Sequence, residues 1–351
     1  MKKKGLTRLF TSICAIAVAA TLIVLMPIGA KQASAKPIAL NVYYHGGVQG
    51  GQADMYRDWI KKVEKATEGR VKLTFYPGAV LGPPMEAYEM IKQGAVHMGC
   101  VIPGFFPGRF PLTNVIQLPF LGIPSAEIGS RMFWELYEKF PEFKEDYPGV
   151  KVIALYSDAP TPIGTKKPVR KMEDLRGLKI RALSGAPTEM LKELGASPLL
   201  LPPHDIYTAM ERGVIDGWMI SWEGCTGMKY EEVTDYFTSA RSYQPALVFL
   251  MNLDAWNKLP SDIQKIFDEH AGAAGAEHFG KGFDYWNNEG KQKVAGMKGK
   301  EIIELSEAEV VRWKKTVRPV WDRWLADMKA KGLPGQAVLD EAERLLKKYT
   351  E

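Results

Sequence analysis

The sequence predicts an exported α/β protein built from two α/β units. Three observations support this fold class. Residues 1–35 have the form of a secretory signal, the residues that follow exceed the length one hydrophobic core usually holds, and strand and helix patterns alternate in two successive series. Two lobes, each with its own sheet, are therefore expected.

The N-terminal segment is predicted to be a cleaved signal peptide. Four basic residues precede an apolar stretch from Leu9 to Ala30, and Ala33-Ser34-Ala35 forms an A-x-A cleavage site. The apolar stretch is long enough for a membrane anchor, but a proline and a glycine interrupt its end and small residues follow. Cleavage is favoured, with the mature chain starting at or near Lys36.

Removal of this segment changes the charge of the protein. The chain has 46 Lys and Arg against 41 Asp and Glu, a formal charge of +5, and residues 1–35 hold five of the basic residues and no acid. The mature chain of about 316 residues is therefore formally neutral. Neutrality argues against nucleic acid as a partner, and no second long apolar run predicts a transmembrane helix.

The sequence does not favour an enzyme or a metal-binding protein. An exported hydrolase is the competing class, but G-x-S-x-G, H-E-x-x-H and C-x-x-C motifs are absent, and the five histidines have no ligand spacing. We expect no catalytic residue, no cofactor and no metal. Cys100 and Cys225 are the cysteines left after cleavage; they could pair, but two buried thiols are favoured.

The strands and helices of each α/β unit are predicted from the periodicity of the apolar residues. In the first, strands are expected at Ile38 to Tyr44, Val71 to Phe75 and Val96 to Ile102, with helices through Met55, Trp59 and Val63 and over Pro84 to Lys92. This order predicts a parallel sheet with right-handed crossovers. The second unit begins near Gly149. Its expected strands are Val150 to Tyr156, Gly164 to Thr165, Leu178 to Leu183 and Asp216 to Ile220, with helices at Pro187 to Leu194 and His204 to Arg212.

The C-terminal third has a different pattern. A further strand is expected at Ala246 to Met251, followed by long amphipathic helices from Ser261 to about Asn288 and from Ser306 to Lys331, and a last helix from Val338 to Tyr349. Helices of such length are expected to span both lobes, and the crossings between lobes would act as hinges.

Seven short segments resemble, in order, the periplasmic solute-binding proteins of TRAP transporters, the DctP-like family of tripartite ATP-independent importers. The resemblance covers essentially the whole mature chain. The segments are Gly69-Arg70-Val71 with Phe75-Tyr76-Pro77-Gly78 and Leu81-Gly82, Gly94-Ala95-Val96-His97-Met98-Gly99, Leu118-Pro119-Phe120, Lys166-Lys167-Pro168-Val169, Asp174-Leu175-Arg176-Gly177-Leu178-Lys179-Ile180-Arg181, Gly213-Val214-Ile215-Asp216-Gly217, and Asn252 through Trp256 to Leu259-Pro260.

The resemblance implies a two-lobed periplasmic binding protein, type II-like, with long helices that span the domains. We expect residues 1–35 as signal peptide, 36–157 plus about 247–287 as lobe I, and 158–246 plus about 288–351 as lobe II with the C-terminal helices. It further implies a periplasmic monomer that closes on a small organic acid and delivers it to integral membrane permease subunits. A solute sensor for a membrane receptor is an alternative that the sequence does not separate from transport.

The resemblance also implies that Arg181 forms a two-pronged salt bridge with the acidic group of the ligand. Guanidinium is a permanently charged planar fork that matches carboxylate or sulfonate oxygens. The structural alternative is that Arg181 caps a helix or pairs with an internal acid.

Other candidate ligand contacts come from strand ends and aromatic residues. Trp218 and Trp222 lie where family members place cleft side chains, although large aromatic residues are more often core. Tyr44 and His45 end the first strand, where α/β proteins tend to place ligand contacts; a surface histidine is the alternative. Asn252 ends another strand and could turn its amide into the cleft or cap the strand end.

Thr161 stands where many family members have a second arginine. Without that cation, a second acidic group on the ligand would lack compensation, so a singly charged acid is favoured. A hydroxy or oxo monocarboxylate is the first expectation, an aromatic acid stacked on a tryptophan the second, and a small sulfonate the third.

Overall fold

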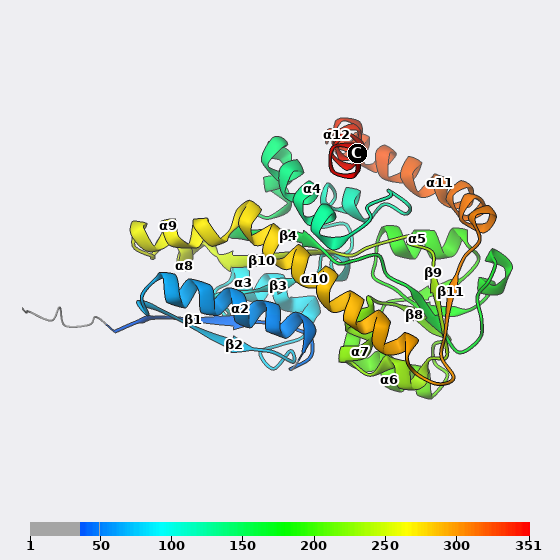
Figure 1. Ribbon diagram of the computed structural model, residues 1–351. Coiled ribbons are helices and arrows are strands. Elements are labelled where there is room, and N and C mark those ends of the chain that lie inside the picture. The colour runs from blue at the N-terminus through cyan, green and yellow to red at the C-terminus, as the bar shows by residue number, and fades with distance from the viewer. Residues whose placement is uncertain (1–35, 49) are drawn as a thin grey trace, which may run out of the picture. The chain divides into compact units, whose positions relative to one another are not determined.

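The computed structural model describes residues 36–48 and 50–351, so the predicted signal peptide lies outside the described residues. Two mixed β-sheets organise the chain (Figure 1). The first has the order β2 (Val71–Tyr76), β1 (Ile38–Tyr43), β3 (Met98–Val101), β10 (Ala246–Asn252), β4 (Val150–Ser157). The second has the order β11 (Glu301–Glu304), β9 (Tyr236–Ser239), β5 (Ile163–Thr165), β8 (Gly217–Met219), β6 (Lys179–Arg181), β7 (Ser197–Leu199). The expected two-lobed α/β fold is confirmed by this arrangement.

Helices surround both sheets. Those before the second sheet are α2 (Gly51–Ala66), α3 (Ala87–Lys92) and α4 (Ala126–Lys139). Those connecting its strands are α5 (Ala186–Glu193), α6 (Pro203–Glu211) and α7 (Trp222–Gly227), and the C-terminal part adds α8 (Leu253–Asn257), α9 (Ser261–His270), α10 (Gly272–Ala295), α11 (Glu307–Ala330) and α12 (Gly335–Thr350). Within the described ranges, none of these helices combines the length and apolar character that a membrane crossing requires.

The expectation of a parallel first sheet is only partly correct. β1 and β3 are parallel, as the alternation of strands and helices predicts. β10, however, is antiparallel to both β3 and β4 and lies between them. Its residues are all buried, because the chain returns from the second sheet and inserts this apolar strand in the middle of the first. β5 is likewise antiparallel to its neighbours β8 and β9.

The expected helix from Ser261 to about Asn288 is two helices. Ala271 is extended, with φ −100° and ψ −170°, and Gly272 follows with φ +59°. A side chain at Gly272 would be strained by that φ and would bring its Cβ within 3.0 Å of the Trp134 ring. The break is anchored by Trp59, whose Nε1 donates to the His270 carbonyl at 2.8 Å. Amphipathic spacing continues across the break, so periodicity alone did not reveal it.

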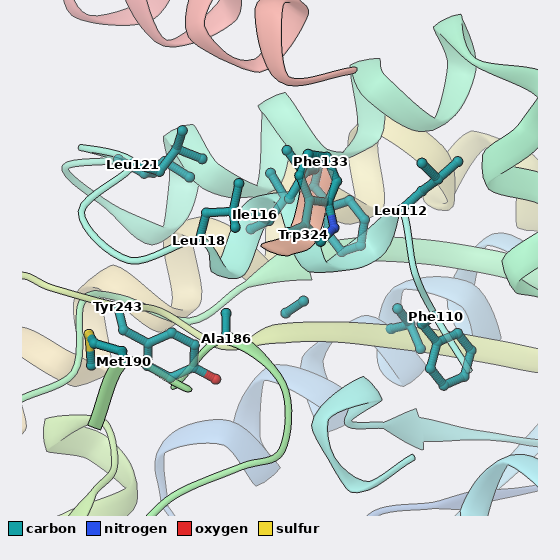
Figure 2. Packing of buried hydrophobic residues seen from close by; sticks show 14 of the residues in the cluster. Phe110, Leu112, Ile116, Leu118, Leu121, Phe133, Ala186, Met190, Tyr243 and Trp324 are labelled. Atoms are coloured by element: carbon teal, nitrogen blue, oxygen red, sulfur yellow. The ribbon is translucent and has the colours of Figure 1, made fainter. Parts of the chain in front are cut away.

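The largest hydrophobic cluster combines residues from both sheets and from α11 and α12. Part of this cluster is drawn in Figure 2, where Trp324 of α11 lies with Phe133 and Ile116. The indoles of Trp321 and Trp324 donate to the carbonyls of Pro119 and Pro111, at 2.9 and 3.0 Å. The C-terminal helices therefore pack on the segment before α4, and α12 also packs on α4 itself.

Cys100 and Cys225 are both free and buried, as favoured from the sequence.

Helix α10 contacts elements of both sheets. It packs against β4, α2 and α4 on one side of the molecule and against α7 on the other. Glycines permit these close contacts: a Cβ at Gly280 would lie 2.8 Å from Glu127 Cα in α4, and one at Gly290 would lie 2.6 Å from the Trp222 carbonyl oxygen in α7. α10 thus connects α7 to the first sheet, and α2 contacts α7 as well.

Candidate functional site

A cavity lies where strand ends of the two sheets meet. It encloses about 750 Å³ of space not filled by atoms, part of which is open to solvent. Its walls come from the residues after β1 and β4, the ends of β6 and β8, the start of β10, the start of α2, and α7. The lining residues are Tyr44, His45, Gly46, Gly47, Gly50, Gln52, Ala53, Ile102, Asp158, Arg181, Leu183, Pro203, Met219, Ile220, Ser221, Glu223, Gly224, Gly227, Met228, Tyr230, Pro245 and Leu247.

Arg181 is the arginine of this cavity. It is the last residue of β6, only 2% exposed, and main-chain carbonyls orient its guanidinium. Nε donates to the Leu201 carbonyl at 2.9 Å, and Nη1 donates to the Met219 carbonyl at 3.4 Å. These two bonds leave further N–H groups of the fork for other acceptors. Burial lowers the pKa of Arg181 to about 10, and no carboxylate of the described residues acts against this shift. The guanidinium stays charged at neutral pH.

Tyr44 and His45 also line the cavity, directly after β1. The Tyr44 hydroxyl donates to Gln52 Oε1 at 2.8 Å, which ties the end of β1 to the start of α2. Burial lowers the pKa of His45 to about 4, and the positive charge of Arg181 adds to this effect. His45 is therefore a neutral imidazole that can accept and donate hydrogen bonds.

Two buried carboxyl groups, Asp158 and Glu223, lie in the same cavity wall. They are 4% and 9% exposed. Burial raises the pKa of Asp158 to about 7, and the neighbouring Glu223 charge raises it further against hydrogen bonds from Ser221 and Asn287. Burial also raises the pKa of Glu223. Each acid thus has a larger uncharged fraction near neutral pH than an exposed carboxyl has.

A hydrogen-bond network holds these two acids in place. Asn287 of α10 donates from Nδ2 to Asp158 Oδ1 at 2.9 Å, and its Oδ1 accepts the Glu223 backbone N–H at 3.3 Å. Glu223 Oε1 accepts the Gln52 backbone N–H at 3.1 Å, in the first turn of α2. The network therefore connects β4, α7, α10 and α2, which belong to different halves of the fold.

Trp218 and Trp222 do not line the cavity, contrary to the expectation from the sequence. Trp218 is fully buried: its indole donates to Thr234 Oγ1 at 2.9 Å, and its ring packs on Tyr230 and Phe237. Trp222 stacks on Phe237 at 5.5 Å. Side chains alternate along β8, so Met219 reaches the cavity where Trp218 does not. Ile220, which follows β8, and the residues that flank Trp222 line the cavity as well.

Asn252 and Thr161 also lie outside the cavity lining. Asn252 Oδ1 accepts the Ala255 N–H as the N-cap of α8, and its Nδ2 donates to the carbonyls of Ile91 and Lys92. The capping alternative is therefore the one observed. Thr161 is buried, and both its backbone N–H and its hydroxyl donate to the Tyr243 carbonyl.

Sequence reasoning did not select Asp158 or Glu223 as site residues. Asp158 directly follows Ser157, the last residue of β4, so the strand-end rule that selected His45 also applies to it. Glu223 follows Trp222 on α7, where the large aromatic residue was given priority. For Asp158, an acidic residue directly after a strand was the available signal.

The two sheets, the cavity at their strand ends and the buried guanidinium of Arg181 define a solute-binding protein of the two-lobed class. Solved structures agree. The chain is similar to a TRAP solute-binding protein from Rhodoferax ferrireducens in complex with copurified benzoate, at 30% identity and a TM-score of 0.83, covering 89% of this chain and 98% of that one. It is similar to a marine metagenome protein specific for aromatic acid ligands, in complex with 3-hydroxybenzoate, at 28% identity and a TM-score of 0.84, covering 90% and 99%. A Bordetella bronchiseptica protein with bound mandelate gives 27% identity and a TM-score of 0.83, covering 89% and 100%.

The chain belongs to the DctP family, bacterial extracellular solute-binding protein family 7, whose model matches residues 49–327. Members of this TRAP class bind small organic ligands and work with membrane permease subunits, and the family implies a periplasmic location.

Proposed function

We propose that this protein captures a small organic monocarboxylate in its cavity through Arg181 and delivers it to the membrane subunits of a TRAP transporter. The buried guanidinium without a carboxylate partner among the described residues carries this proposal. A buried cation is costly unless an anion compensates it. A ligand carboxylate would supply that anion, and the fixed fork would accept it with two parallel bonds.

Arg181 supplies only part of the required affinity. Charge-assisted hydrogen bonds contribute about 1.5–3 kcal/mol each, whereas micromolar binding needs about 8 kcal/mol. The remaining affinity comes from apolar walls such as Leu183, Met219 and Leu247 and from closure of the lobes around the ligand. We assign the lobes as the sequence predicts, with closure providing the shape difference that the membrane subunits would detect.

The walls favour a ligand with an apolar body. The three solved relatives named above hold benzoate, 3-hydroxybenzoate and mandelate, all of which are monocarboxylates with an aromatic ring. We infer that an aromatic or hydroxy monocarboxylate fits this cavity better than a dicarboxylate, because Arg181 is the cation of its lining and two acids stand in the same wall. A small sulfonate, the alternative ligand, would bind to the same guanidinium.

A thermal-shift screen of an organic-acid library tests the proposal. A ligand present at 100 times its Kd stabilises the folded protein by about 2.7 kcal/mol. The best monocarboxylate is expected to raise the Tm of the wild-type protein and to leave the Tm of Arg181→Ala unchanged. An equal shift in both proteins would refute the assignment. Arg109→Ala is the matched control, since Arg109 packs on Tyr88 and pairs with Glu89 outside the cavity lining.

A further inference from the structure

The cavity contains polar groups that a carboxylate on Arg181 does not use. Asp158 and Glu223 are buried acids that line it, and neither forms an ion pair with Arg181, whose described hydrogen bonds go to main-chain carbonyls. We propose, on the basis of the proposed capture by Arg181, that Asp158 and Glu223 form a second recognition point for a hydroxyl group of the ligand. The ligand class then narrows to monocarboxylates that carry a hydroxyl.

The hydrogen bonds of Glu223 are incomplete, whereas Asp158 has several partners. Asp158 Oδ1 accepts bonds from Ala159 N–H at 2.8 Å and from Asn287 Nδ2 at 2.9 Å, and Ser221 is a further hydrogen-bond partner of its carboxyl. Glu223 Oε1 accepts the Gln52 N–H, whereas Glu223 Oε2 is buried and has no hydrogen-bond partner among the described residues. A buried polar atom left without a partner is unfavourable, because it loses its bonds to water without replacement.

Hydrogen bonds from other elements hold the two acids in place. Asn287 of α10 bonds to both segments, and Gln52 of α2 bonds to Glu223. Rigid support of this kind is typical of groups that recognise a ligand.

A hydroxyl fits this pair better than an ammonium group. No ion pair within residues 36–48 and 50–351 neutralises either acid, and burial raises the pKa of both, which favours an uncharged carboxyl over the carboxylate that an ammonium would need. An uncharged carboxyl both donates and accepts a hydrogen bond, as a hydroxyl does. The neighbouring lining residues Ile102, Ile220 and Leu247 are apolar and suit the carbon body between the two polar groups.

Matched ligand pairs test this inference by calorimetry on the full mature protein. The probes are benzoate with 3-hydroxybenzoate, phenylacetate with mandelate, and 3-(aminomethyl)benzoate as the ammonium probe. We expect the hydroxylated member of at least one pair to bind wild-type protein about tenfold more tightly or better, because loss of a hydroxyl leaves the acids without a partner. In Asp158→Ala this preference falls to about twofold, while the affinity for the member without a hydroxyl changes little.

Asp158→Asn separates recognition from folding, since an amide keeps one donor and one acceptor at the same place. It is expected to retain a preference of about threefold or more. Asp146→Asn is the control: Asp146 is also a buried acid with a raised pKa, but it bonds to Thr113 outside the cavity lining and its variant keeps the full preference.

Three results would overturn the inference: equal binding of both members of every pair, tighter binding of the ammonium probe, or an equal loss for both members in Asp158→Ala. In these cases Arg181→Ala would still abolish binding of the acids, and the proposed function would stand. If Arg181→Ala kept wild-type affinity, the proposed function would fail instead.

Discussion

The two polar regions of the cavity are built in different ways. Arg181 is held by carbonyls of Leu201 and Met219, all within the second sheet and its connections. Asp158 and Glu223 depend on Asn287 and Gln52, which come from α10 and α2. The cation is thus preorganised within one half of the fold, whereas the acidic region is assembled from both halves. If the lobes close as proposed, this difference predicts that an anion is captured first and that closure completes its recognition.

The largest expected effect comes from the cationic region. Arg181→Ala removes two charge-assisted bonds of about 1.5–3 kcal/mol each, so ligand affinity falls by about 100-fold or more. Arg181→Lys keeps the charge but loses the fork and costs about tenfold. Calorimetry with the best ligand from the screen measures both values. A lysine variant with wild-type affinity would contradict a fork-like contact.

The scaffold of the acidic region is tested at Gly290. A Cβ there would lie 2.6 Å from the Trp222 carbonyl oxygen and 3.0 Å from the Glu223 nitrogen, so Gly290→Ala forces α10 away from α7. We expect the free energy of unfolding to fall by about 1–3 kcal/mol, as for overpacking elsewhere, with a weaker preference for hydroxylated ligands. Urea denaturation measures the first effect.

Gly296→Ala is the matched control for this variant. Gly296 caps the end of α10 with φ −81°, and a Cβ there would meet only carbonyl oxygens at 3.6 Å. Its stability should equal or exceed that of the wild type. Equal behaviour of both variants would show that the α10–α7 contact is dispensable.

Asn252 lies outside both polar regions of the cavity. Asn252→Ala removes the N-cap of α8 and two bonds to the carbonyls of Ile91 and Lys92, so stability should fall by about 1–2 kcal/mol. Ligand affinity should not change. Denaturation measures the stability of the variant, and calorimetry on the same sample measures its ligand affinity. A large loss of affinity would show that Asn252 contacts the ligand.

The smallest expected effect is a pH dependence of binding. Asp158 has a pKa of about 7, raised by burial and by Glu223, and faces Ser221 and Asn287. An anion on Arg181 disfavours ionised Asp158, so the complex takes up a proton and affinity falls as the pH rises through 7. A Kd increase of about fivefold from pH 6 to pH 8.5 is expected by linkage.

His45 does not contribute to this pH dependence, because its pKa of about 4 keeps it neutral throughout that range. Asp158→Asn should therefore give a Kd that is independent of pH. An undiminished slope in that variant would assign the titration to another group.

The fold could be predicted from the sequence to a large extent, because strands and helices leave local periodic patterns. The two α/β series, the long C-terminal helices and the position of Arg181 at the end of a short strand follow from such patterns. Local patterns do not report strand direction, so the antiparallel insertion of β10 was missed. The break at Ala271 and Gly272 was also missed, because the same amphipathic spacing continues through both helices.

By itself, the sequence determined the class of protein and selected the cation that is expected to meet the ligand. Tertiary structure decided which neighbours of that cation reach the cavity, because the direction of a side chain at a strand end depends on packing from distant segments. Packing buried Trp218 among aromatic residues and committed Asn252 to a helix cap. It also brought Asp158 and Glu223, distant in the chain, into one wall through a single asparagine of α10.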